Sequence, residues 1–466
     1  MQQNNQKPAT SPRKKILVET WGCQMNVADS EKMLGMLQDQ NYETTQSPEE
    51  ADLVLLNTCH IREKAKHKVV SRLGRLREIQ KKNKNMKIAV AGCVAQAEGK
   101  KLLKQTGNID ILVGPGKIDD LPKLIEENQK TGAQQLSIGF KKAKDHEEET
   151  KDTKSKVNPS LAGKNTVSRY VNIAQGCDNF CTFCVVPFTR GREISLHPSK
   201  IIDDVTQQVE SGAREVTLLG QNVNSYGHDL IRSNKLELTN DGPFVNLLRD
   251  VAAIDGLQRL RFTTSNPHDF TLSLAKLFRD ERKLGKYIHL PVQSGSDVVL
   301  ERMKRKVTVA EYYERINWLQ KASPEIAIST DLIVGFPGET EEQFEETVEL
   351  VKNIRYSFFY AFKYSTRKGT AAARFLDQIP EEIKSRRLAK LMAVQDKITI
   401  ELNKNEIGNV REVLFQYESS KEPGIYYGRT EQFRLVRVKS NHNLVGELRM
   451  VEINDANKTA LVGSLL

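Results

Sequence analysis

The sequence predicts an α/β protein with an N-terminal parallel-sheet domain, a central partial (β/α)6 barrel and a small C-terminal antiparallel β-barrel. Three observations support this prediction. Short apolar runs alternate with helical patterns along most of the 466 residues, which is typical of parallel sheets covered by helices. A charged segment interrupts this alternation once. After Gly408 the helical patterns stop, and short strands separated by turn residues follow.

Changes in composition predict the domain boundaries. Residues 1–13 are rich in Gln, Asn and Pro, which predicts a disordered tail. The segment 141–162 begins with eleven charges in sixteen positions, which predicts a mobile linker. The first domain then covers 14–140, the central domain 163–398 and the last domain 400–466. No apolar run approaches the length of a membrane span, and the N-terminus lacks a signal-peptide core, so we expect a cytoplasmic protein without a membrane segment.

In the first domain, three predicted strands are each followed by a cysteine. The strands are Lys15–Glu19, Asp52–Asn57 and Lys87–Ala91, and the cysteines are Cys23, Cys59 and Cys93. Because the carboxyl ends of parallel strands meet at one edge of a sheet, we expect the three thiols to gather there. Disulfides are disfavoured in a reducing compartment, which favours a metal site. The alternative is three small core residues, since cysteine is often buried. Helices are predicted at Asp29–Gln40 and Arg62–Lys82, and a further strand at Ile109–Val113.

The central domain repeats the strand–helix alternation six times. Its predicted strands are Arg169–Ala174, Glu215–Leu219, Arg259–Thr264, Tyr287–Leu290, Ala327–Val334 and Ser357–Lys363. Its predicted helices include Pro198–Ser211, Ala310–Lys321 and a long one at Ile383–Asn403. Polar, glycine-containing loops follow several of the strands, at the edge where active residues of such barrels lie. The last domain is predicted to contain the strands Val410–Tyr417, Tyr426–Ser440, Gly446–Ile453 and Lys458–Ser464.

The loop after the first of these central strands contains Cys177, Cys181 and Cys184 in a C-x3-C-x2-C spacing. Three thiolates so close together can hold three irons of a [4Fe–4S] cluster and leave the fourth iron open. A zinc knuckle is the alternative. Zinc normally takes four ligands in C-x2-C pairs, and no fourth Cys or His lies nearby in the sequence.

The run GCDNFCTFCVVPFTRGRE, Gly176 to Glu193, resembles the core of the radical S-adenosylmethionine (SAM) methylthiotransferase family. The runs TWGCQMNVADSE, LLNTC and AGC resemble the family's three auxiliary-cluster motifs, and the resemblance extends from Lys14 to the C-terminus. It implies two [4Fe–4S] clusters, one on each cysteine set, together with SAM. The residues that it makes candidates for SAM contact are Gln221, Asn222, Gln293, Ser294 and Asp331. No catalytic acid or base is identified.

The resemblance also implies a reaction. A family member would use two SAM molecules and a 5′-deoxyadenosyl radical to add a 2-methylthio group to N6-isopentenyladenosine beside the tRNA anticodon. The wording of WGCQMN and GQNVNSY is closest to that branch. Alternative substrates are threonylcarbamoyl-adenosine in tRNA or a ribosomal-protein aspartate, and a non-catalytic iron–sulfur or RNA-binding protein is a further alternative. Expected partners are tRNA, an electron donor such as flavodoxin or ferredoxin, and a sulfur source; a monomer is expected.

Basic residues predict where RNA would bind. The net charge is +10, and 62–87 contain eleven Lys or Arg against two Glu, which indicates either a phosphate-contacting helix or a solvated face. The last domain resembles the TRAM module, an RNA-binding barrel, although it carries nine basic and nine acidic residues from Ile400 onward. The candidate RNA contacts are Lys64, Lys68, Arg72 and Arg75 in the first domain and Arg429, Arg434 and Arg437 in the last.

Overall fold

A computed structural model describes residues 13–59, 63–140 and 166–466, without the side chains of 63–66. It divides into two compact units, 1–161 and 162–466. Residues 1–12 of the tail predicted at 1–13 and the whole linker predicted at 141–162 lie outside the described residues. Within those residues, no helix combines the length and the apolar character that a bilayer crossing requires.

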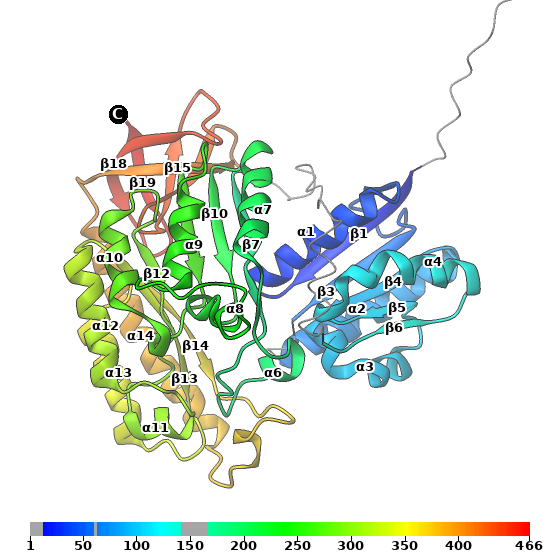
Figure 1. Ribbon diagram of the computed structural model, residues 1–466, viewed down its shortest axis with the longest axis horizontal. Helices are drawn as coiled ribbons and strands as arrows, with labels where there is room; N and C mark the ends of the chain where they lie inside the picture. Colours follow the sequence, from blue (N-terminus) through cyan, green and yellow to red (C-terminus); the bar gives the residue numbers. More distant parts are fainter. Residues whose placement is uncertain (1–12, 60–62, 141–165) are drawn as a thin grey trace, which may run out of the picture. The chain divides into compact units, whose positions relative to one another are not determined.

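The first unit contains a six-stranded parallel sheet with the order β2-β1-β3-β4-β5-β6 (Figure 1). Its strands are β1 Lys14–Trp21, β2 Tyr42–Thr44, β3 Leu53–Thr58, β4 Lys87–Gly92, β5 Ile111–Val113 and β6 Gln135–Ser137. Its helices are α1 Gln24–Gln38, α2 Glu63–Lys82, α3 Cys93–Thr106 and α4 Leu121–Thr131. Strand β3 is buried along its whole length, as expected for a central strand with helices on both sides.

Two separate cores pack on the two faces of this sheet. Helices α1 and α4 cover one face, where Leu37 and Leu121 lie in the same apolar cluster. Helices α2 and α3 cover the other face through Leu73 and Leu102. This is the arrangement that right-handed β-α-β crossovers produce. The sheet therefore delivers the carboxyl ends of β1, β3 and β4 to one edge, as the sequence predicts.

The second unit begins with six parallel strands in the order β7-β10-β11 and β12-β13-β14. A parallel bridge between Leu260 and Leu284 joins the two groups. The strands are β7 Ser168–Asn172, β10 Glu215–Leu219, β11 Arg259–Thr263, β12 Tyr287–His289, β13 Ala327–Val334 and β14 Phe358–Lys363. The covering helices are α7 Pro198–Glu210, α9 Pro243–Ala252, α10 Leu272–Asp280, α12 Val309–Ala322, α13 Glu341–Ile354 and α14 Glu381–Lys404. The predicted partial barrel is confirmed.

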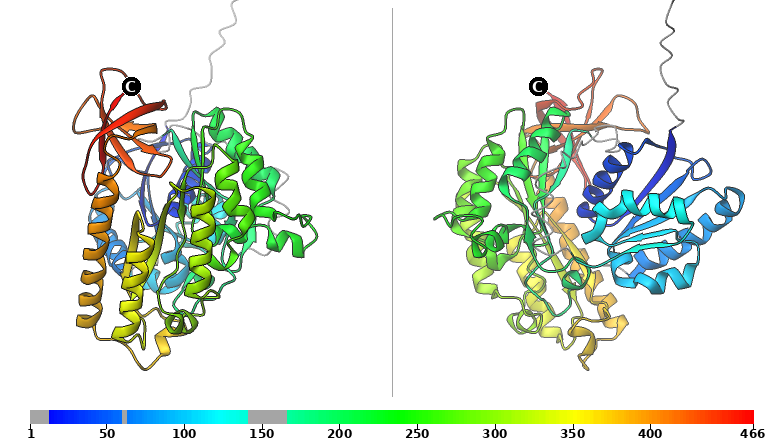
Figure 2. Two further views of the ribbon diagram at one scale, coloured as in Figure 1. Left: turned by 90° about the vertical axis from the view of Figure 1, so that its left-hand side faces the viewer. Right: turned by 45° about the vertical axis from the view of Figure 1, so that its right-hand side comes forward.

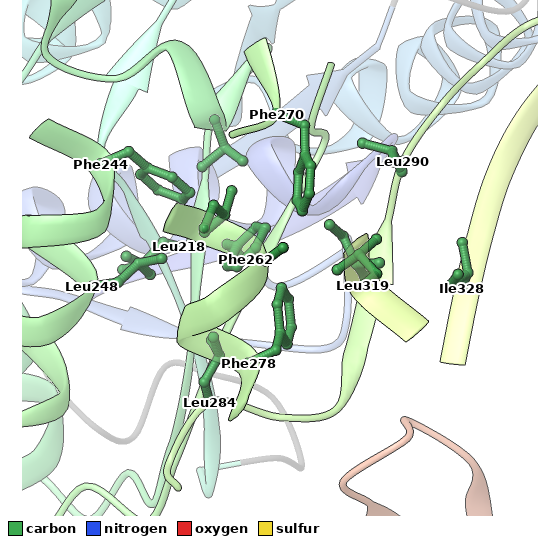
Figure 3. Packing of buried hydrophobic residues seen from close by; sticks show 14 of the residues in the cluster. Leu218, Phe244, Leu248, Phe262, Phe270, Phe278, Leu284, Leu290, Leu319 and Ile328 are labelled. Atoms are coloured by element: carbon green, nitrogen blue, oxygen red, sulfur yellow. The ribbon is translucent and has the colours of Figure 1, made fainter. Parts of the chain in front are cut away.

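One large apolar cluster holds the helices on the strands (Figure 3). Near its centre, Phe262 of β11 meets Phe244 of α9 edge to face, with ring centroids 5.2 Å apart. Phe278 of α10 lies on another side of Phe262 at 5.9 Å. Such tilted aromatic pairs add stability beyond the apolar area they bury. This packing fixes the positions of strands β10, β11 and β12, and therefore also the positions of the loops at their carboxyl ends.

The chain ends in a closed five-stranded barrel of order β15-β16-β17-β19-β18, to which α14 leads (Figure 2). Its strands are β15 Val410–Glu418, β16 Ile425–Thr430, β17 Leu435–Lys439, β18 Leu448–Ala456 and β19 Leu461–Leu465. The prediction of a single strand Tyr426–Ser440 was wrong, because a turn at 431–434 splits it into β16 and β17. Phe433 adopts φ 66° there, and no Gly, Pro or Asn marks the turn in the sequence.

Helix α1 also differs from its prediction, since it begins at Gln24 and not at Asp29. Cys23 occupies its N-cap position with extended backbone angles. The amide oxygen of Asn26 accepts a hydrogen bond from the Cys23 backbone N–H at 3.3 Å. This hydrogen bond belongs to a capping box formed by Cys23 and Asn26. The helix therefore begins directly after the cysteine. Cys23 is thereby fixed by the first turn of α1.

Candidate iron–sulfur and cofactor sites

The C-x3-C-x2-C loop leaves β7 through the two-residue strand β8 Ala174–Gln175, which pairs with β9 Ile194–Ser195. Gly176 begins the loop at φ 83°. A Cβ at this position would lie 2.6 Å from the carbonyl oxygen of Gly191. Only glycine tolerates both the left-handed backbone and this close approach. The loop that carries the three cysteines therefore turns sharply at Gly176.

Each of the three sulfur atoms receives an N–H group. The side-chain amide of Asn179 donates to Sγ of Cys177 at 3.6 Å. The backbone N–H of Val186 donates to Sγ of Cys184 at 3.5 Å. A guanidinium nitrogen of Arg305 donates to Sγ of Cys181 at 3.7 Å. Donors aimed at sulfur stabilise a thiolate and tune the potential of a cluster that it holds.

The three thiols are close enough to influence one another. Burial, with a smaller contribution from the charge of Cys181, raises the pKa of Cys177 to about 11 and that of Cys184 to about 12, against the opposing hydrogen bonds from Asn179 and Val186. Metal binding at Cys177 and Cys184 would displace the thiol protons, since metal ligands bind as thiolates. All six cysteines of the chain lie in the described residues, and none forms a disulfide.

No three His, Cys, Asp or Glu side chains among the described residues gather tightly enough to hold a single metal ion. A four-iron cluster makes a different demand, because each thiolate binds its own iron at a separate corner. The sequence of the second unit contains only these three cysteines. The donor set therefore fits a cluster with one open iron better than a four-ligand zinc site.

A cavity of about 160 Å³ lies beside the cysteine loop. It is lined by Asp178, Asn179, Glu193, Asn222, Ser225, His228, Arg232, His268, Asp269 and Lys306. The Ser225 hydroxyl donates to Glu193 at 2.6 Å, and the Asn222 amide donates to Asp269 at 2.7 Å. Burial raises the pKa of Glu193 to about 7; the Ser225 hydrogen bond opposes the rise, and neighbouring carboxylates add to it. The cavity thus presents partly buried carboxylates alongside cationic groups.

The five residues predicted to contact SAM lie in two groups of segments, the loop after β10 and the region of β12 and β13. Gln221 accepts a hydrogen bond from the backbone N–H of Gly176, so it ties the loop after β10 to the cysteine loop. The side-chain oxygen of Asn222 is buried and has no hydrogen-bond partner among the described residues. Both lie at the expected edge. Their roles as cofactor contacts stay predictions.

The other three candidates lie elsewhere on this side of the barrel. Gln293 follows β12 at φ 84°, and its backbone N–H donates to the carbonyl of Asp331 at 3.0 Å. Asp331 lies along β13, with its carboxylate 3.4 Å from Nε2 of His289. Ser294 is fully buried, and its hydroxyl pairs with that of Thr347 on α13 at 3.3 Å. The Ser294 hydroxyl is therefore engaged by Thr347 in the described structure.

The second cysteine set lies at the edge of the sheet in the first unit, as predicted. Trp21 pairs with Thr58 in the parallel register of β1 and β3, and Thr58 pairs with Gly92 in that of β3 and β4. Cys59 and Cys93 each come one residue after these paired positions, and Cys23 comes two residues after Trp21. The register alone therefore brings all three cysteines to the same level of the sheet.

Small residues let the cysteine segments approach. A Cβ on Gly22 would lie 2.9 Å from Cβ of Cys59 and would overlap the side chain of Asn26. Asn26 is fully buried and bonded through its amide to Asn57 of β3 at 3.2 Å. Cys23 and Cys93 stand at the N-termini of α1 and α3, where the helix dipole favours a negatively charged ligand. This donor set also fits three irons of one cluster.

The basic residues predicted on α2 have different environments. The side chain of Lys64 lies outside the described residues. Lys68 and Arg75 are exposed. Arg72, in contrast, binds Glu19 of β1 through two nitrogens, with Nε 3.0 Å from each carboxylate oxygen. Arg72 therefore supports the packing of α2 on the sheet, while Lys68 and Arg75 remain candidates for phosphate contact.

The three arginines of the last barrel also have intramolecular partners. The guanidinium of Arg429 lies 4.1 Å from the Phe433 ring centroid and donates to the Phe433 carbonyl at 2.9 Å. Arg434 lies 3.3 Å from Glu406 and also contacts Asn403. Arg437 pairs at 2.5 Å with Glu422, which is more than half exposed. Arg437 is thus the most accessible of the three candidates.

Sequence reasoning missed Arg305 and most of the cavity residues. Glu193 closes the run GCDNFCTFCVVPFTRGRE, and its place in that run is the signal that could have identified it. Arg305 lies 121 positions after Cys184 in a basic segment, RMKRK, which has the composition of an ordinary solvated helix end. Only the tertiary structure brings it to the sulfur.

Comparison with known proteins agrees with this geometry. Residues 15–114 match a family model described as uncharacterized protein family UPF0004, and residues 171–351 match the radical SAM superfamily. Curated relatives named tRNA-2-methylthio-N(6)-dimethylallyladenosine synthase align over nearly the full length. The protein of Syntrophotalea carbinolica is 41% identical, covering 97% of this chain and 99% of its own. That of Stutzerimonas stutzeri is 42% identical, covering 97% and 99%.

Among solved structures, the chain resembles the radical SAM methyltransferase TsrM of Kitasatospora setae, determined with cobalamin and a [4Fe-4S] cluster bound. The TM-score is 0.54 at 14% identity, covering 78% of this chain and 77% of that protein. At this identity the likeness concerns the fold alone.

Proposed function

The chain belongs to the family of tRNA-2-methylthio-N(6)-dimethylallyladenosine synthases, and we propose that it adds a 2-methylthio group to N6-isopentenyladenosine beside the anticodon of tRNA. The observation that carries the proposal is the pair of three-cysteine sets, Cys23/Cys59/Cys93 and Cys177/Cys181/Cys184. Each set stands where strands of its own sheet end. One set suits radical generation, and the other suits storage of the sulfur to be transferred.

Two [4Fe–4S] clusters and SAM supply the reaction chemistry when bound: one-electron cleavage of SAM for C–H activation, and transfer of a methylated sulfur. The chain's own residues hold and orient these groups. Each cysteine set provides three thiolates and leaves one iron open to a small ligand. Asn179 and Val186 donate N–H groups to the sulfurs of Cys177 and Cys184. Gln221 fixes the loop after β10 against the start of the cysteine loop.

The cavity beside the cysteine loop suits the amino-acid end of SAM. That end is a zwitterion, and the lining offers carboxylates such as Glu193 and Asp269 together with Lys306 and Arg232. The unpartnered side-chain oxygen of Asn222 is available to an ammonium donor. At about 160 Å³ the cavity admits only that end of the cofactor. We propose Gln293 and Asp331 near the nucleoside end, and we leave Ser294 out because Thr347 holds its hydroxyl.

The substrate must present a single nucleobase to the radical. An adenosine beside the anticodon lies in a loop, where a base can be unstacked and inserted into an active site. Exposed Lys68 and Arg75 on α2 and the five-stranded barrel at the C-terminus are the proposed tRNA contacts. A flavodoxin or ferredoxin as electron donor, a separate sulfur source, a monomeric state and a cytoplasmic location complete the proposal.

The decisive test is mass spectrometry of tRNA nucleosides from cells lacking the gene, with and without the restored protein. We expect 2-methylthio-N6-isopentenyladenosine to disappear and its unthiolated precursor to accumulate. Loss of the methylthio derivative of threonylcarbamoyl-adenosine, or of a modified ribosomal aspartate, would instead identify one of the alternative substrates. Unchanged tRNA and ribosomal protein would contradict a methylthiotransferase.

A second test separates the two cysteine sets. The anaerobically reconstituted chain should hold about eight irons, and changing Cys177, Cys181 and Cys184 to Ala should leave about half. Changing Cys59 to Ala should abolish methylthiolation while SAM cleavage continues, because radical formation depends on the other set. Equal loss of both activities in a folded Cys59→Ala variant would contradict this division.

A further inference from the structure

Arg305 places a positive charge against the cysteine loop. One guanidinium nitrogen lies 3.7 Å from Sγ of Cys181, and the other donates to the carbonyl oxygen of Pro291 at 2.6 Å. Its Nε is buried and has no hydrogen-bond partner in the part of the chain that is described. Asn179 and Val186 give their sulfurs neutral donors. Arg305 is charged, and charge-assisted hydrogen bonds are roughly twice as strong as neutral ones.

The backbone at Arg305 is fixed by the end of helix α11, Asp297–Arg302. The N–H of Arg305 donates to the carbonyl of Leu300 at 2.9 Å, and the N–H of Lys304 donates to that of Glu301 at 2.8 Å. Lys304 adopts φ 55°. These two bonds and the left-handed residue form a Schellman motif. The motif determines where the Arg305 side chain leaves the helix.

The same helix end holds the cysteine loop. Thr182, between Cys181 and Cys184, donates its backbone N–H to the carbonyl of Met303 at 3.0 Å. Its hydroxyl donates to the carbonyl of Arg302 at 2.9 Å. Arg305 and Cys181 are thus carried by two segments that are bonded to each other. The 3.7 Å approach of the Arg305 guanidinium to Cys181 is therefore made between two segments whose relative position is fixed by backbone bonds.

We propose that Arg305 is a positioning residue of the Cys177/Cys181/Cys184 cluster, which holds the Cys181 thiolate in place and raises the cluster's reduction potential. The inference rests on the proposed function. In the step concerned, the cluster takes one electron from a low-potential one-electron donor; no proton is taken up and no bond of the protein changes. The negative charge of the site increases by one. A fixed cation beside a ligand sulfur therefore stabilises the reduced form more than the oxidised form.

The test is a redox titration of the Arg305→Gln and Arg305→Lys variants with dithionite and viologen mediators. Electron paramagnetic resonance of the reduced cluster is the readout. The full chain also carries Cys23→Ala, Cys59→Ala and Cys93→Ala, so that one cluster titrates. We expect Arg305→Gln to lower the midpoint potential by about 59 mV or more. For a one-electron step, this shift is a tenfold change in the electron-transfer equilibrium constant. Arg305→Lys keeps the charge and should stay close to the parent.

Arg302→Gln is the matched control. Arg302 is three residues away, but its guanidinium pairs with Asp377 at 2.7 Å and lies over the Phe375 ring. Its substitution should leave the potential unchanged. An unchanged potential in Arg305→Gln, or an equal shift in Arg302→Gln, overturns the inference. Weaker SAM binding at an unchanged potential would make Arg305 a cofactor anchor and also overturns it.

Iron content separates the remaining outcomes. If Arg305→Gln loses iron while Arg305→Lys retains it, the cation is required to hold Cys181, which supports the inference. If both variants lose iron, the shape of the arginine matters and its charge does not, and the inference fails. A parent chain that forms no four-iron cluster would refute the proposed function itself. A parent with a cluster that is insensitive to Arg305 would refute only the role of this residue.

Discussion

The ring of Phe433, from the turn between β16 and β17, stacks on the ring of Tyr287 in β12 with centroids 4.7 Å apart and an interplanar angle of 18°. The guanidinium of Arg261 lies 5.0 Å from the centroid of the same Phe433 ring. Arg261 also donates to the carbonyls of Thr430 at 2.8 Å and Glu431 at 2.9 Å. The C-terminal barrel is therefore joined to the partial barrel through one specific turn.

A buried charge pair supports this connection. Arg261 bonds Glu215 at 2.7 Å, and their side chains are only 2% and 1% exposed. Glu215 also accepts hydrogen bonds from Ser168 at 2.8 Å and from Gln416 of β15 at 3.0 Å. Buried charges are tolerated when they are paired and fully hydrogen-bonded in this way. The network gives the two barrels a defined relative orientation.

Replacing Phe433 with Ala should therefore lower the free energy of unfolding by about 3 kcal/mol, since a packed aromatic ring is removed. Chemical denaturation of the purified chain measures this change. Tyr427→Ala is the matched control, because Tyr427 stacks on Tyr417 within the same barrel at 5.3 Å. It should lower the free energy of unfolding by less, since the stacked pair itself contributes only about 1 kcal/mol. Equal decreases in the two variants would show that Phe433 has no special role in joining the barrels.

The second prediction concerns the close approach at the auxiliary cysteines. Gly22→Ala should cost the chain about half of its iron while SAM cleavage continues, because the new Cβ would press on Cys59 at 2.9 Å and displace one ligand. Iron analysis and 5′-deoxyadenosine formation measure the two effects. Gly74→Ala, on α2, meets nothing within 4 Å and should keep all its iron. Full iron content in Gly22→Ala would mean that the cysteine positions tolerate a shift of this size.

Much of this architecture could be predicted from local patterns. The position of each auxiliary cysteine after a strand followed from apolar runs, because parallel register requires strand ends to meet. The C-x3-C-x2-C loop was recognisable from its spacing alone. The turn at Phe433 could not be predicted, since its left-handed conformation is stabilised by Tyr287 and Arg261, which are distant in sequence. The same holds for Arg305, whose position depends on how α11 packs on the cysteine loop.

The sequence also does not show which polar side chains are already bound to other residues of the chain. A basic helix looks uniform, but Arg72 binds Glu19 across the sheet while Lys68 and Arg75 face solvent. Ser294 occupies a polar loop at the correct edge, yet its hydroxyl turns to Thr347. Both distinctions arise from tertiary packing and decide which residues remain available for ligands.

The third prediction uses this distinction on α2. Changing Lys68 and Arg75 to Gln should weaken tRNA binding and reduce its salt dependence by a slope of about one for each phosphate that the variant no longer neutralises. Changing Arg72 to Gln should instead lower stability, because Glu19 would be left without its bidentate partner. Binding titrations at several salt concentrations and denaturation curves measure the two effects. If the Lys68/Arg75 variant binds like the parent, the charge of α2 is only a solvated face.

The last prediction applies the same reasoning to the C-terminal barrel. Arg437 pairs with Glu422, whose side chain is 58% exposed, and such pairs contribute little to stability. A phosphate can replace that carboxylate, so Arg437→Gln should weaken tRNA binding and flatten its salt dependence while stability stays within about 0.5 kcal/mol. Arg434 is bound to Glu406 at 3.3 Å with its side chain 13% exposed. Arg434→Gln should therefore lower stability and leave the salt slope unchanged. The opposite pattern, a changed slope for Arg434 and none for Arg437, would show that tRNA binding rearranges this barrel.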